Sequence, residues 1–69
     1  IKMTIREFFV INDDIDVNQN IAVKDVTGKA LFEGELHLFS SKFTRMFNMH
    51  NVTHMRYIKD KDIWEFEIW

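Results

Sequence analysis

The stretch NIAVKDVTGKALFEGEL, residues 20–36, predicts a β-hairpin. Ile21 and Val23 alternate with polar residues, as in a strand that buries one face. The turn at residues 26–29 contains Gly28, which tolerates the positive φ that tight hairpin turns need. After the turn, alternation places one set of residues on one face, Ala30, Phe32, Gly34 and Leu36, and another set on the opposite face, Leu31, Glu33 and Glu35. We therefore expect strands at 20–26 and 30–36.

A short helix is expected before this hairpin. Thr4 followed by Glu7 fits a capping box, in which the two side chains satisfy free backbone N–H groups at a helix start. Three apolar residues then fall at i, i+3 and i+4, namely Ile5, Phe8 and Phe9. Such spacing gives a helix of about two turns with one apolar stripe. It should end near residues 12–14.

A second helix is expected after the hairpin, in the stretch that holds all three histidines, residues 37–55. Ser40 or Ser41 is suited to cap it. Four residues then recur at helical spacing and predict a buried face, namely Phe43, Met46, Phe47 and His50. Asn48 or Asn51 should end the helix.

The last part of the chain predicts a second hairpin, with strands at 52–58 and 63–69 and a charged turn at 59–62. In the final strand three apolar residues alternate with glutamates, at Trp64, Phe66 and Ile68. Because the sequence ends at Trp69, inside or just after a strand, we expect this strand to form a sheet edge that can recruit another strand.

The predicted order is therefore α-β-β-α-β-β, in one α+β domain that covers residues 1–69. A chain of this length buries only about 60% of its unfolded surface and cannot support two cores. Two short helices and two hairpins can bury their apolar faces only against each other. We expect a two-layer fold, with two short helices on an antiparallel four-stranded sheet.

The histidines raise the possibility of a metal site. His50 and His54 are four residues apart, which on one helix would place both rings on the same face. The β-branched residues Val52 and Thr53 favour a strand instead, which separates the two rings. His37 can approach only through the fold, and no third ligand is apparent. We expect the histidines to cap, to pack or to face water, with no metal and no cofactor.

The acidic run before the first hairpin resembles a calcium-binding loop. Asp14, Asp16, Asn18 and Asn20 repeat every two residues, and Asp25 stands twelfth. The sixth position holds glutamine where the sharp turn requires glycine, and the twelfth holds aspartate where the loop uses a bidentate glutamate. We therefore interpret this run as a solvated loop that leads into a strand.

No constellation of catalytic residues is apparent. Ser40 and Ser41 lie near His37 in sequence only, and helix capping already accounts for them. The paired glutamates follow from the two-residue period of strands. There is no glycine-rich phosphate loop, and a domain of this size rarely encloses the ~300 Å³ that a small-molecule site requires. We expect a protein that is not an enzyme.

The composition favours a cytoplasmic protein without membrane contact. No apolar run approaches the ~18 residues of a membrane span, and no leader-like segment begins the sequence. The chain has no cysteine, which fits a reducing compartment. The net charge is −2, which gives no strongly basic surface for phosphate backbones.

Two stretches, MTIREFF at 3–9 and VKDVTGKALFEGEL at 23–36, resemble small orphan accessory proteins of phages and conjugative elements from Gram-positive bacteria. These stretches are followed by a short helix and an aromatic hairpin, as in that group. No residue-level activity comes with the resemblance. It implies an accessory protein of a mobile genetic element that acts by binding another protein.

The leading functional hypothesis is a non-enzymatic protein-interaction module that can self-associate through a sheet edge or an exposed apolar surface. Methionine adapts to irregular partners and aromatic residues anchor interfaces, so we assign this surface to Met49, Met55, Tyr57 and Trp69. The competing interpretation is that all four are core residues.

The alternative hypothesis is a weak nucleic-acid-binding accessory factor. Basic residues on the second helix and on the last hairpin would form its binding strip, namely Lys42, Arg45, Arg56 and Lys59. Acidic residues alternate with this set, so a mixed-charge solvated surface is the simpler interpretation.

Overall fold

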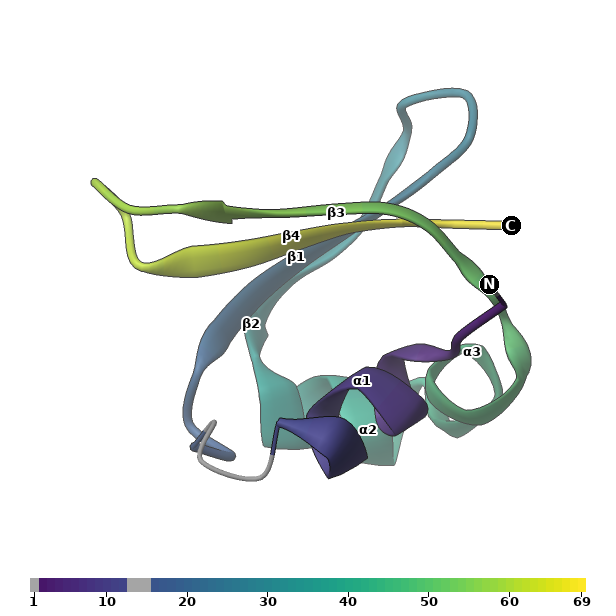
Figure 1. The fold of residues 1–69 in the computed structure, drawn as a ribbon, viewed down its shortest axis with the longest axis horizontal. Helices are drawn as coiled ribbons and strands as arrows, with labels where there is room; N and C mark the ends of the chain where they lie inside the picture. The colour runs from purple at the N-terminus through teal and green to yellow at the C-terminus, as the bar shows by residue number, and fades with distance from the viewer. Residues whose placement is uncertain (1, 13–15) are drawn as a thin grey trace.

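A computed structural model describes residues 2–12 and 16–69. Its elements are α1 (Ile5–Ile11), β1 (Asn20–Asp25), β2 (Ala30–Glu35), α2 (Leu36–Lys42), α3 (Thr44–Met49), β3 (Val52–Ile58) and β4 (Ile63–Ile68). The three helices gather under one face of the sheet, and the turn between β3 and β4 projects beyond them (Figure 1). The predicted α+β class with two layers is confirmed.

The sheet is mixed, with the strand order β2-β1-β4-β3. Each hairpin is antiparallel, as predicted, but β1 and β4 run parallel to each other. The prediction of a purely antiparallel sheet was therefore wrong. The α2–α3 connection carries the chain from one outer strand to the other, so the second hairpin returns its last strand beside β1. Local alternation carries no information about that crossover.

The final strand does not form a sheet edge, contrary to our expectation. β4 lies between β1 and β3, so Trp69 follows an interior strand. Among the described residues the outer strands are β2 and β3. In the second hairpin, the strand that can accept another strand is therefore β3 and not β4.

The capping box at the start of α1 is confirmed. The Glu7 N–H donates to the Thr4 hydroxyl at 3.1 Å, and the Thr4 N–H donates to the Glu7 carboxylate at 3.2 Å. Asn12 caps the other end, where its N–H donates to the Phe8 carbonyl. Of the predicted helix end at 12–14, positions 13 and 14 lie outside the described residues.

The single helix predicted after the first hairpin is two helices, α2 and α3, separated at Phe43 (φ −122°, ψ 51°). Ser40 and Ser41 lie inside α2 and cap neither helix. Their hydroxyls donate to carbonyls three residues earlier, and the Thr44 hydroxyl donates back to α2 carbonyls. Side chains that bond to nearby backbone in this way weaken and bend a helix, and three of them lie around the break at Phe43.

The turn between β1 and β2 has the predicted chemistry. Gly28 adopts a φ of 89°. The Asp25 carboxylate accepts from the Thr27 N–H at 2.9 Å and from the Lys29 N–H at 3.0 Å. These hydrogen bonds lower the pKa of Asp25, with the Thr27 hydroxyl as the largest cause.

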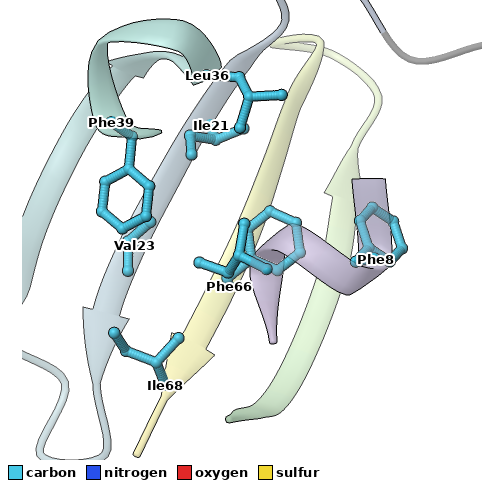
Figure 2. Close-up of a cluster of buried hydrophobic side chains, with 8 residues drawn as sticks. Phe8, Ile21, Val23, Leu36, Phe39, Phe66 and Ile68 are labelled. Carbon is cyan, nitrogen blue, oxygen red and sulfur yellow. The ribbon is translucent and has the colours of Figure 1, made fainter. Parts of the chain in front are cut away.

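The core lies between the helices and one face of the sheet (Figure 2). Its members are Ile5, Phe8, Ile21, Val23, Leu36, Phe39, Phe66 and Ile68. Phe39 of α2 and Phe66 of β4 are fully buried. Met46 and Phe47, predicted to be core, are partly buried and pack against this cluster. The other face of the sheet carries the alternating charged residues.

Candidate functional site

The outer strand β3 is seven residues long, and the segment before α1 covers its start. The Val52 N–H donates to the Met3 carbonyl at 2.6 Å, and Thr4 forms an isolated bridge with Asn51. The register of the hairpin shifts by one residue between Val52 and His54, which marks a β-bulge. We call the remainder of the strand, residues 54–58, the β3 edge.

The direction of the backbone groups along the β3 edge follows from the hydrogen-bond pattern. The Asn51 carbonyl accepts from the Trp69 N–H at 2.9 Å, so odd-numbered residues of β4 direct their backbone groups towards β3. Beyond the bulge these residues stand opposite the even-numbered residues of β3. The N–H and C=O groups of Met55 and Tyr57 therefore point away from β4, towards the outside of the sheet.

One side of the β3 edge is apolar and continues the core. Met55 pairs with Phe66 and Tyr57 pairs with Trp64, so their side chains share the face that the helices cover. The Tyr57 and Trp64 rings lie 5.3 Å apart between centroids. Because the hairpin extends beyond the helices, Met55 remains 47% exposed and Tyr57 45% exposed. This placement explains why they are apolar and yet accessible.

The turn after the β3 edge is held by two side chains. Tyr57 donates its hydroxyl proton to the Asp62 carboxylate, which raises the pKa of Tyr57. Gln19 donates from Nε2 to the Asp62 carbonyl at 2.8 Å. Asp62 itself adopts a φ of 52°, in the left-handed region that disfavours most L residues. These contacts orient the Tyr57 ring beside Trp64.

The other side of the β3 edge presents the Arg56 guanidinium and the His54 imidazole. Arg56 donates from Nε to Glu65 at 2.9 Å, and the His54 Nδ1 lies 3.0 Å from Glu67. The Arg56 and His54 side chains are 69% and 82% exposed, whereas those of their glutamate partners are 21% and 20% exposed. The carboxylates lie inward on β4, so the strand offers its basic groups to the solvent.

Both glutamates are held in the ionised form. The hydrogen bond from Arg56 is the main cause that lowers the pKa of Glu65, and Lys24 adds to it from 3.6 Å. The Thr53 hydroxyl, followed by His54, lowers the pKa of Glu67. A hollow of about 450 Å³ on this side of the sheet is lined by Lys24 of β1, by His54, Met55 and Arg56 of β3, and by the two glutamates.

The four residues predicted for partner binding are all exposed, but the structure brings together only Met55 and Tyr57. Met49 ends α3. Trp69 is five residues beyond Trp64, which is about 16 Å along an extended strand. The proposed surface is therefore the β3 edge, and Met49 and Trp69 do not belong to it.

The basic residues proposed for nucleic-acid binding do not form one strip. Lys42 and Arg45 lie on α2 and α3, in the helical layer, whereas Lys59 lies in the turn beyond the helices (Figure 1). Arg56 is paired with Glu65 on the opposite face of the sheet. Because no single surface carries the set, the geometry gives this alternative no support.

His37 and His54 contact different glutamates in different parts of the molecule. His37 Nε2 contacts Glu35 at 2.7 Å on the helical side of the molecule, while His54 belongs to the open face of the sheet. Within residues 2–12 and 16–69, no three acidic or imidazole side chains come together as metal ligands do. Asp14 of the calcium-like run lies outside the described residues.

A second hollow, of about 330 Å³, lies where α1 meets α2 and α3. It is lined by Arg6, Phe9, Val10, Val17, Leu36, His37, Ser40 and Phe47. Its mixture of apolar walls and rim residues shows no convergent polar set that would select a ligand.

Within the described part of the chain, no helix has the length and apolarity to cross a membrane.

Sequence reasoning identified Met55 and Tyr57, assigned Arg56 only to the alternative nucleic-acid strip, and missed His54 as part of the same surface. The signal was present in the alternation THMRYI at 53–58, which interleaves basic and apolar residues. What could not be read was that β3 is an outer strand.

Comparison with protein families, with curated proteins and with solved structures finds no match to this chain.

Proposed function

We propose that this protein is a non-enzymatic interaction module that binds an extended segment of another protein along the β3 edge. The observation that carries the proposal is the outward direction of the Met55 and Tyr57 backbone groups on an outer strand. An extended segment placed there gains main-chain hydrogen bonds, while alternate side chains provide specificity. The half-exposed apolar pair supplies the desolvated contact that such interfaces use.

The resemblance of residues 3–9 and 23–36 supports a role as an accessory protein of a phage or conjugative element. The cysteine-free chain is compatible with action in the cytoplasm. The partner is then a protein encoded by the host or by the element.

Proline substitution tests the proposal because proline removes the backbone donor and obstructs an added strand. Met55→Pro should abolish capture of a specific protein from the host, whereas Met55→Ala keeps the N–H group, loses only side-chain contact, and should weaken the capture without abolishing it. Circular dichroism of each variant establishes that it is folded.

Glu33→Pro, on the other outer strand, is the matched control. The even-numbered residues of β2 direct their backbone groups towards β1, so the backbone groups of Glu33 point outward as those of Met55 do. It should leave capture unchanged. Equal capture by wild type and Met55→Pro, or loss only in Glu33→Pro, would contradict the assignment of the β3 edge.

A further inference from the structure

The two sides of the β3 edge differ in chemistry, and this difference restricts what can pair with it. One side offers Met55 and Tyr57, and the other offers His54 and Arg56. Residues directly opposite one another in a sheet interact, with opposite charges favourable and like charges unfavourable. A strand added here must therefore place apolar residues on one face and acidic residues on the other.

The hairpin itself contains a strand of this kind. β4 reads IWEFEI, and it places Trp64 and Phe66 against the apolar side of β3 and Glu65 and Glu67 against the basic side. Since side chains alternate along β3, an added strand meets the same two rows from the outer side. Arg56 uses its Nε for Glu65, and a guanidinium carries five N–H donors, so it has the capacity to bind a second carboxylate.

A second copy of β3 is a poor occupant by the same criterion. In an antiparallel pair formed around Met55 or around Arg56, the basic row of one copy stands opposite the basic row of the other. In the register around Arg56, the two guanidinium groups would stand opposite each other, which costs free energy. In the register around Met55, Arg56 would face the His54 imidazole of the second copy, so neither register gives Arg56 a carboxylate partner. Charge complementarity favours a different chain.

We infer that the β3 edge takes an extended segment of another protein in which acidic and apolar residues alternate. This inference rests on the proposed function and specifies its partner. The acidic residues would lie opposite His54 and Arg56, and the apolar residues opposite Met55 and Tyr57. The segment would join the sheet as a fifth strand beside the four in the chain.

Synthetic peptides test the inference. The probe is a nonapeptide in which four glutamates alternate with valine, tyrosine and valine between terminal glycines, and the control replaces each glutamate with lysine. Fluorescence anisotropy at low salt should show about tenfold or greater preference for the glutamate peptide, the factor that corresponds to ~1.4 kcal/mol. A third peptide with the same composition but without alternation should bind more weakly.

Variants of this protein test whether the peptide binds through Arg56 and through the outward backbone groups of the β3 edge. Arg56→Gln should weaken the glutamate peptide by about two- to fivefold and leave the lysine peptide unchanged or improved. Met55→Pro should abolish binding. Lys42→Gln, which removes a cation from the helical layer, is the control and should have no effect.

Failure of the inference is distinct from failure of the proposed function. Equal binding of both charged peptides, or binding of neither, overturns the inference, while loss of host-protein capture in Met55→Pro would still support strand addition. Concentration-dependent association of the wild type in sedimentation, abolished by Met55→Pro, would also overturn the inference, because the occupant would then be a second copy.

Discussion

At the scale of single residues, Asp62 has two structural roles in the turn between β3 and β4. Its backbone adopts a φ of 52°, and its carboxylate and carbonyl accept hydrogen bonds from Tyr57 and Gln19 respectively. Aspartate and asparagine tolerate the left-handed region better than other residues with a side chain. The same residue therefore determines the turn and the position of the Tyr57 ring.

Replacement of Asp62 should separate these two roles. Asp62→Ala loses the carboxylate and bears the left-handed conformation, at a cost of ~1–2 kcal/mol in the free energy of unfolding. Asp62→Gly also loses the carboxylate but adopts the left-handed conformation without strain, so it should be less destabilising than alanine. Urea unfolding measures both. Greater stability of the alanine variant than of the glycine variant would show that backbone conformation does not control this turn.

Glu65 predicts a pH dependence of stability. Its pKa is lowered in the folded protein by Arg56 and Lys24. The stabilisation is therefore complete above the ordinary pKa of about 4.3 and is lost as the pH falls through the lowered value. Urea midpoints between pH 7 and pH 3 should decline less steeply in Glu65→Gln than in the wild type. Glu33→Gln, which removes an exposed carboxylate from β2, is the control and should follow the wild-type curve.

At the scale of elements, α2 shows how a short helix is kept in place by tertiary packing. Neither α2 nor α3 has a side-chain cap, and neither exceeds seven residues, so both are marginal as isolated helices. Phe39 is fully buried and stacks on Phe43, with ring centroids 5.6 Å apart. The break at Phe43 lets apolar residues of both helices pack against the core cluster.

Truncation of the buried aromatic residue should unfold the domain. Phe39→Ala is expected to cost ~3–5 kcal/mol, which equals the stability of ~3–5 kcal/mol available to a chain of this size. Leu38→Ala, one residue earlier on α2 and half-exposed, should cost well under 1 kcal/mol. Thermal unfolding followed by circular dichroism compares the two, and similar losses would place the core elsewhere.

At the scale of the whole molecule, the strand order gives the sheet two interior strands, β1 and β4, and two accessible outer strands, β2 and β3. β1 and β4 each pair with neighbours on both sides, whereas β2 and β3 pair on one side. The turn that joins β3 to β4 also extends beyond the helices (Figure 1). Stability and the proposed binding surface are therefore located on different strands.

Amide hydrogen exchange should reproduce this arrangement. Amides of β1 and β4 should exchange through global unfolding, and those of Met55 and Tyr57 should exchange orders of magnitude faster because they face outward. The amides of His54 and Arg56 face β4 and should be protected, so protection should alternate along β3. Uniform protection along β3 would contradict the derived register.

The sequence by itself determined the capping box, the turn at Gly28 and both hairpins. All of these depend on contacts or alternation within a few residues. Only the tertiary structure decided that β1 and β4 pair in parallel, that the middle helix breaks at Phe43, and that β3 is the outer strand. Strand order is set by packing between segments distant in the chain, and the alternation of a strand is the same at the centre of a sheet as at its margin.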